Sequence, residues 1–156
     1  MTEPVVHDTF VLERSYPKSP SAVFAAFADP AKKRRWYAEG EGHELDGFEM
    51  EFRVGGIERA AYRLGAQTPF PGTPLIAEGR YEDIVEGARV VISSTMSLGS
   101  RRISTAIATF ELFGESGGTR LVLTHQAAFY EGADGPAMRR GGWEKLLDQL
   151  TAELGR

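Results

Sequence analysis

Only the C-terminal part of this chain carries the pattern of a long helix, and this restricts the fold more than any other feature of the sequence. The apolar residues there recur at spacings of three and four: Trp143, Leu146, Leu147, Leu150 and Leu154. Asp134 and Pro136 are expected near the start of this helix, and Gly155 at its end. One long helix must therefore cover whatever sheet the rest of the chain forms.

The preceding segments follow the alternation of antiparallel strands instead. A first strand is predicted over Val5–Ser15, and a hairpin begins at His43. In the hairpin, Met50, Phe52 and Val54 alternate before Gly55-Gly56, and Ala60, Tyr62 and Leu64 alternate after it. Four more strands are predicted at Leu75–Val85, Arg89–Met96, Arg101–Phe113 and Thr119–Ala127. Short turns containing glycine separate these segments, so we expect an antiparallel meander.

Two short helices are expected between the first strand and the hairpin. Ser19-Pro20 and Asp29-Pro30 each combine a capping side chain with a proline suited to a first helical turn. The second helix should run through Trp36. It carries the basic run Lys32–Arg35, which we expect to form a solvated helix face. The stretch Gln67–Pro74 has no period and is expected to be a loop.

These elements predict an α+β fold in a single domain, residues 1–156. A twisted antiparallel sheet that curls around one helix, with short helices at one end, tends to enclose a cavity instead of closing on itself. Gly141 and Gly142 would let the long helix lie close to the sheet or bend over that cavity. The cavity is therefore where we expect function.

Composition excludes several kinds of chemistry. The chain has no cysteine, and its three histidines, His7, His43 and His125, lack the short spacing of a metal-binding pair. No glycine-rich phosphate-binding motif is present. With a net charge of −4, we expect no nucleic acid partner, and we also expect no metal and no cofactor. The longest apolar run, Ala22–Ala28, is too short to span a bilayer, so we expect a cytoplasmic protein with no membrane partner.

Two further motifs are expected to be structural. The segment Gly114–Gly118 matches the hydrolase pattern G-x-S-x-G, but a strand follows it where a hydrolase needs a helix, so we expect a hairpin turn. Arg53 alternates away from Met50 and Phe52, which predicts a position in solvent. Neither motif is therefore expected to carry chemistry.

The candidate binding residues are large side chains on the predicted inward faces and at the helix ends. They are Trp36, Tyr37, Met50, Phe52, Tyr62, Tyr81, Met96, His125, Phe129, Trp143 and Leu147. Such side chains form either a packed core or the wall of a cavity for an apolar ligand. His125 shares one strand face with Leu121 and Leu123, which leaves three roles open: a core histidine, a ligand contact or an acid-base group.

Five short motifs, in order along the chain, resemble a known superfamily. They are Ala25-Ala26-Phe27-x-Asp29-Pro30 with Trp36-Tyr37, Arg53-Val54-Gly55-Gly56, Gly79-x-Tyr81, Gly118-Thr119-Arg120-Leu121 with Thr124-His125, and Gly142-Trp143. Together they are similar to the SRPBCC (START-like, helix-grip) superfamily, and within it to homologues of the activator of the heat-shock-protein-90 ATPase. The resemblance implies a curved antiparallel sheet of about seven strands around a long C-terminal helix, with a hydrophobic ligand cavity between them. It also implies that Trp36, Tyr37 and Trp143 border that cavity.

Three function hypotheses follow, because this superfamily uses one scaffold for several roles. The first is a binding module for a hydrophobic or aromatic small molecule. The second, less favoured, is an enzyme of the cyclase or dehydratase type, with His125 and either Tyr62 or Tyr81 as acid-base groups. The third is a protein-interaction module, for which a chaperone partner is a weak expectation because the eukaryotic activators carry a further N-terminal domain. The edge strand Val5–Ser15 also leaves room for a homodimer.

Overall fold

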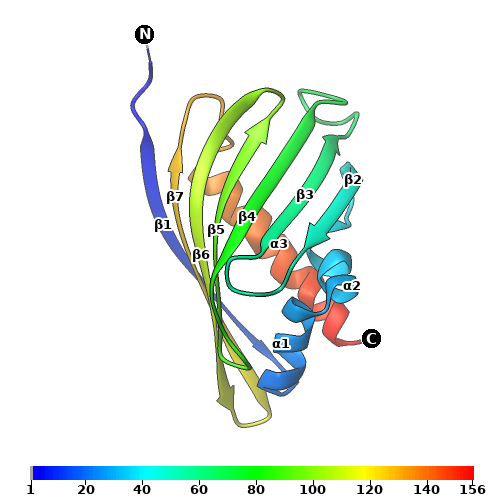
Figure 1. The fold of residues 1–156 in the computed structure, drawn as a ribbon. Helices are drawn as coiled ribbons and strands as arrows, with labels where there is room; N and C mark the ends of the chain where they lie inside the picture. Colours follow the sequence, from blue (N-terminus) through cyan, green and yellow to red (C-terminus); the bar gives the residue numbers. More distant parts are fainter. Residues whose placement is uncertain (1) are drawn as a thin grey trace.

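The computed structural model describes residues 2–156 and forms one curved antiparallel sheet of seven strands with a long helix across one face (Figure 1). The elements follow in the order β1 (Val6–Tyr16), α1 (Pro20–Ala28), α2 (Pro30–Lys33), η1 (Arg34–Ala38), β2 (His43–Met50), β3 (Ile57–Leu64), β4 (Pro74–Val85), β5 (Arg89–Leu98), β6 (Arg101–Glu115), β7 (Gly118–Phe129) and α3 (Pro136–Leu154). This is the α+β, helix-grip arrangement that the sequence predicts.

The strands β2 to β7 form a meander, and β1 completes the sheet beside β7. The order across the sheet is β1-β7-β6-β5-β4-β3-β2, so β1 and β2 are its two edges. The chain passes from β1 to β2 through α1, α2 and η1, and Figure 1 shows these short helices beside the C-terminal part of α3. The pairings of β2 with β3, β4 with β5 and β5 with β6 each contain a register shift. Such bulges bend strands and increase their twist, which helps the sheet curve around α3.

The turn between β2 and β3 begins earlier than the alternation predicts. β2 ends at Met50, so Phe52 and Val54 fall outside the strand. A Cβ on Gly56 would overlap the backbone oxygen of Glu51, so only glycine lets the chain fold back this closely. The strand predicted through Val54 is therefore wrong at its end, because the close turn starts before the apolar alternation stops.

The two motifs expected to be structural are confirmed as such. The hairpin turn between β6 and β7 contains Gly117 at a φ of +82°, a conformation that favours glycine. The side chain of Arg53 is 65% exposed and pairs with Glu51. Both expectations held because they depended only on the alternation of the strands and on turn chemistry.

The short helices begin as predicted. Ser19 Oγ accepts a backbone hydrogen bond at 3.2 Å and Asp29 Oδ1 accepts one at 2.9 Å, so each side chain caps a helix. The π-helical turn η1 then carries the chain through Trp36, whose indole Nε1 donates to the backbone oxygen of Ala26 at 2.8 Å. This bond attaches η1 to α1.

One residue of the basic run contradicts the expectation of a solvated face. Lys33 is only 3% exposed, although Arg34 beside it is exposed. Lys33 lies three residues before the buried Trp36, so it shares the helix face that packs inward. The prediction that the whole basic run faces solvent is therefore wrong for this lysine.

The C-terminal half of α3 packs into the main core. Leu147 and Leu150 are fully buried, in a cluster with side chains from α1, η1, β1 and β4 to β7. The Tyr16 hydroxyl of β1 donates to the backbone oxygen of Leu147 at 3.0 Å. Arg35 of η1 donates to both carboxylate oxygens of Glu153, at 2.8 and 2.7 Å. Apolar packing and these polar contacts fix this half of the helix in place.

The N-terminal half of α3 is packed much less. Between Pro136 and Trp143 only Arg139 is buried. A Cβ on Gly141 or Gly142 would meet nothing within 4 Å, so both glycines face open space. The expectation that they bring the helix close to the sheet is therefore wrong.

Candidate functional site

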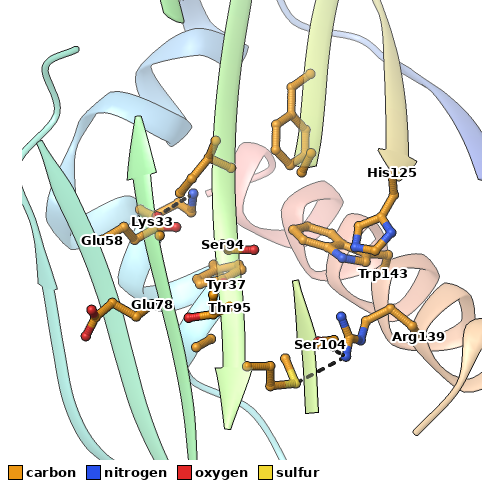
Figure 2. Close-up of a pocket in the computed structure, with 16 residues that line it drawn as sticks. Lys33, Tyr37, Glu58, Glu78, Ser94, Thr95, Ser104, His125, Arg139 and Trp143 are labelled. Carbon is orange, nitrogen blue, oxygen red and sulfur yellow. Dashed lines mark hydrogen bonds and ion pairs between the residues drawn. The ribbon is translucent and has the colours of Figure 1, made fainter. Parts of the chain in front are cut away.

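A small cavity lies between the N-terminal half of α3 and the inner face of strands β3 to β7 (Figure 2). Its volume is about 50 Å³, which is room for a few water molecules. Apolar side chains such as Ile92, Phe110 and Trp143 form part of the wall. The wall also carries polar side chains: Lys33, Tyr37, Glu58, Glu78, Ser94, Thr95, Ser104, His125 and Arg139. The cavity is thus of mixed polarity, and its buried charged groups, Lys33, Glu58 and Arg139, gather at two ends, while Glu78 is exposed and pairs with Arg59.

One end contains a buried ion pair. Lys33 Nζ lies 2.8 Å from Glu58 Oε1, and the two side chains are 3% and 6% exposed. The Tyr81 hydroxyl donates to the same Glu58 oxygen at 2.9 Å. Burial, and then the negative charge of Glu58, raise the pKa of Tyr81, so this phenol stays protonated and keeps donating.

Aromatic rings surround the Lys33 ammonium on its other sides. Its Nζ lies 4.7, 5.3 and 5.4 Å from the ring centroids of Tyr37, Trp36 and Phe27. The faces of aromatic rings attract cations, most strongly when water is excluded. One carboxylate and three rings therefore hold this charge inside the protein.

The other end of the cavity is built around Arg139, in the first turns of α3. Its Nε and Nη2 donate to the two carboxylate oxygens of Asp134, both at 2.8 Å. Nη2 also donates to Ser104 Oγ at 2.9 Å and contacts Met96 Sδ at 3.5 Å, and the guanidinium carbon lies 5.1 Å from the Phe129 ring centroid. Among residues 2–156, no hydrogen bond is found for Nη1. The guanidinium is thus fixed in direction while one of its nitrogens stays available.

His125 of β7 faces the same end of the cavity, as its alternation with Leu121 and Leu123 predicts (Figure 2). Its imidazole stacks on Phe10, with ring centroids 4.7 Å apart. Burial, and then the positive charge of Arg139, lower the pKa of His125 to about 4, so the ring is neutral at pH 7. Its Nδ1 is buried without a hydrogen-bond partner among residues 2–156, an arrangement that costs about 1–3 kcal/mol.

Four further polar groups of the wall make no hydrogen bond to the described part of the chain. They are the hydroxyls of Tyr37, Ser94 and Thr95 and the Trp143 indole N–H. None is fully enclosed, because within residues 2–156 His125 Nδ1 is the one fully buried side-chain nitrogen or oxygen without a partner. All four can donate, as can Arg139 Nη1. The cavity therefore suits a molecule that carries hydrogen-bond acceptors.

The structure brings together some of the predicted binding residues but not all of them. Those that line the cavity are Tyr37, Met96, His125 and Trp143. Those buried elsewhere in the core are Trp36, Tyr81, Phe129 and Leu147, and those that pack against the core are Met50 and Phe52. Tyr62 lies against His43, with ring centroids 4.7 Å apart. The aromatic set is therefore mostly core, and a small part of it is cavity wall.

Sequence reasoning missed the buried charged residues of the cavity, although the same patterns contained a signal for each of the three. Glu58 alternates with Ala60 on the inward face of β3. Arg139 lies four residues before Trp143, on the same helix face, and Lys33 lies three before Trp36. A charged residue at an apolar position of the period was the sign to look for, because a charge at such a position needs a buried partner.

The acid-base pair required by the cyclase or dehydratase hypothesis is not assembled. Neither Tyr62 nor Tyr81 lines the cavity with His125, and Tyr81 is already bonded to Glu58. The described residues also contain no group of three or more His, Asp or Glu side chains that could hold a metal ion. Over the same residues, no helix has the length and apolar character needed to cross a membrane.

Several residues of the five sequence motifs serve the fold. Asp29 caps α2, and Gly56 allows the close turn before β3. A Cβ on Gly118 would overlap the backbone of Tyr16, and the neighbouring Thr119 Oγ1 donates to the oxygen of Lys18 at 2.7 Å. These motif residues therefore stabilise the fold, and they do not line the cavity.

Comparisons with solved structures agree with this fold along nearly the whole chain. The Mll3558 protein of Rhizobium loti is 40% identical, with a TM-score of 0.86, over 97% of this chain and 99% of that one. A protein of Rhizobium leguminosarum is 34% identical, with a TM-score of 0.89, over 98% and 97% of the two chains. The AHSA1 protein of Silicibacter pomeroyi is 25% identical, with a TM-score of 0.72, over 95% and 98%. Among curated proteins, none matches.

The family assignment rests on the sequence as a whole. Residues 17–155 match the family model described as Activator of Hsp90 ATPase homolog 1-like protein. This match covers both short helices, strands β2 to β7 and the long helix. The resemblance seen in the five motifs is thereby confirmed, and the chain belongs to the AHSA1-like family of SRPBCC-type domains.

Proposed function

We propose that this protein is a binding module that holds a small molecule of mixed polarity in the cavity between the sheet and α3. The observation that carries the proposal is the set of wall groups with no hydrogen-bond partner within residues 2–156, above all the buried Nδ1 of His125. Buried polar groups are nearly always hydrogen-bonded in folded proteins. A bound molecule would supply the missing partners.

The apolar side chains of the wall support the same proposal. Trp143, Phe110 and Ile92 can hold the apolar body of a ligand, while the unpaired donors orient its polar atoms. This combination departs from the purely hydrophobic or aromatic ligand that the sequence suggested. The ligand we propose is therefore apolar over part of its surface and carries acceptor atoms at one end.

The size of the cavity sets a condition on this function. A volume of about 50 Å³ is well below the roughly 300–1,000 Å³ of pockets that enclose drug-sized ligands. A ligand of more than a few atoms must therefore displace part of the rim. The N-terminal half of α3 is the part of the rim best suited to move, because Arg139 is the one buried residue between Pro136 and Trp143.

Native mass spectrometry of the freshly purified protein, followed by denaturing extraction, tests the proposal directly. We expect either a co-purified small molecule or, for the empty protein, a rise in Tm when small organic acids and amides are screened. A wild-type protein that retains no mass and is stabilised by none of these compounds contradicts the proposed function.

A matched pair of variants on β5 tells cavity binding from binding elsewhere. Ser94→Leu places an apolar side chain in the cavity, whereas Ser93→Leu makes the same change on the opposite face of the strand. We expect S94L to lose the retained mass or the ligand-induced rise in Tm, and S93L to keep it. Equal loss in both variants would place the binding outside the cavity.

A further inference from the structure

We infer that the ligand of this cavity is a small organic acid, whose carboxylate binds at the Arg139 end between that guanidinium and the imidazole of His125. This inference deepens the proposed function and rests on it. It names the chemical class of the ligand and the direction in which the ligand lies, with its acid group toward Arg139 and its apolar body toward Trp143 and Phe110.

The geometry of Arg139 is the first support for this inference. Four contacts fix the guanidinium: the Asp134 carboxylate, the Ser104 hydroxyl, Met96 Sδ and the Phe129 ring. Its side chain is 9% exposed, so these contacts fix the direction of Nη1 in the ligand-free structure, and they move together with Arg139 only if the start of α3 shifts. A planar guanidinium binds carboxylate oxygens more strongly and more directionally than neutral groups do.

The second support is His125, which is independently unsatisfied. Its Nδ1 has no hydrogen-bond partner in the described part of the chain, and the side chain is 3% exposed on the same part of the wall. The charged groups that face it are Arg139 from α3 and Asp134 from the loop before α3, while Phe10 and Trp143 contribute rings. A carboxylate placed here would bring a negative charge next to the imidazole. That charge opposes the effect of Arg139 and favours the protonated ring, so we expect His125 to take up a proton from solvent on binding and to donate a hydrogen bond to the acid.

The Lys33 end of the cavity is a poorer place for the same group. The Lys33 charge is balanced at 2.8 Å by Glu58, and the ammonium is enclosed by three aromatic rings. A second carboxylate there would lie beside that of Glu58 and be repelled by it. At the Arg139 end the balancing carboxylate, Asp134, occupies only Nε and Nη2 and is 22% exposed. The open donors therefore point to that end.

The cavity volume suggests the probes to use. Because about 50 Å³ accepts only a few atoms without movement of the rim, the series should begin with acetate and continue through butyrate to benzoate. Benzamide serves as the uncharged match for benzoate, since it has the same ring and the same carbonyl. Affinity for each probe is measured by isothermal titration calorimetry at pH 7.

Arg139→Gln, with Arg140→Gln as its control, tests the role of the guanidinium. Arg140 is the next residue of α3, is half-exposed and pairs with Glu144, so its loss changes the net charge equally. It does not line the cavity, and its one contact toward the site is with the Phe10 ring, 5.8 Å from the guanidinium carbon. We expect R139Q to weaken benzoate binding at least tenfold and R140Q to change it less than twofold. Should R139Q fail to fold, Arg139→Lys is the alternative. It keeps the positive charge but lacks the planar guanidinium with its fixed N–H donors, and we expect it to weaken binding by a similar factor.

Proton uptake gives a second readout, one that a merely structural role of His125 would not produce. Calorimetry of benzoate binding in two buffers of different ionisation enthalpy should show proton uptake by the wild type and none by His125→Gln. Benzamide should take up no proton with either protein.

The results with benzoate and benzamide distinguish a failure of the carboxylate inference from a failure of the proposed binding function. Tight binding of benzamide that R139Q leaves unchanged, with no preference for benzoate, would overturn the carboxylate inference and leave the binding function in place. Binding of none of the probes, together with no co-purified molecule, would overturn both.

Discussion

Two buried cations stand at the two ends of the cavity, and they differ in how fully the protein satisfies them. Lys33 has a carboxylate at 2.8 Å and three aromatic rings around it, and both members of its ion pair are almost fully buried. Arg139 has a carboxylate that is 22% exposed, and its Nη1 is without a partner among residues 2–156. A charge whose contacts are complete within the chain serves the fold, whereas one with a spare donor can serve a ligand.

The greatest loss of stability is expected from a substitution at the Lys33 end of the cavity. Lys33→Met leaves the Glu58 carboxylate buried without its counter-charge, and we expect a loss of about 3–5 kcal/mol in the free energy of unfolding. Urea unfolding followed by tryptophan fluorescence measures this loss. The double variant K33M/E58L replaces the pair with apolar side chains and should recover most of it. A double variant no more stable than K33M would show that the pair itself is not what Lys33 contributes.

At the Arg139 end of the cavity, His125 is expected to make stability depend on pH. The pKa of His125 is about 4 in the folded protein, against 6.5 for the ordinary side chain. As the pH falls below 6.5 the unfolded chain takes up this proton first, so stability falls between pH 6.5 and pH 4, by on the order of 3 kcal/mol in full. His125→Gln removes this contribution. The difference between wild type and H125Q in unfolding free energy should therefore change over that interval and be constant above pH 7.5.

Arg139→Gln should cost less stability than Lys33→Met, which compares the two buried cations directly. Its partner Asp134 is partly exposed and can be solvated by water after the substitution, so we expect a loss of about 1–2 kcal/mol. Equilibrium unfolding of the two variants in one buffer gives the ratio. A loss as large as that of K33M would mean that the ion pair of Arg139 and Asp134 serves the fold in the same way as that of Lys33 and Glu58.

The smallest expected effect concerns the helix that carries Arg139. Gly141→Ala should stabilise the protein by about 0.5–1 kcal/mol, because a Cβ there meets nothing and alanine favours the helix. Ala152→Gly, at an exposed position in the packed half of α3, should destabilise by a similar amount. Thermal unfolding of both variants checks the signs. A less stable G141A would reveal that this position needs glycine's conformational freedom.

The fold was predictable from the sequence because its signals are local and repeated. Alternation in the strands, capping at Ser19 and Asp29, and the stripe of Leu147 and Leu150 each predicted the element that is observed. His125 was placed on the inward face of its strand by the same alternation. Where alternation met a close turn, after Met50, the prediction was wrong because the contact that defines the turn is not local.

The candidate site was only partly predictable, for a physical reason. Aromatic side chains look alike in a core and in a cavity wall, so the sequence could not separate Trp36, which is core, from Tyr37, which faces the cavity. The charges of Lys33 and Glu58 meet across elements far apart in the chain. No spacing rule links two such residues, and only the assembled sheet and helices show that they are partners.

An NMR titration with benzoate would read both ends of the cavity in one experiment and test the central contrast most directly. Side-chain signals of Arg139, His125 and Lys33 would be followed at pH 7 as the acid is added. We expect the signals of Arg139 and His125 to shift together and saturate, while the Lys33 signal stays in place. Shifts centred on Lys33, with Arg139 and His125 unmoved at saturation, would contradict this expectation.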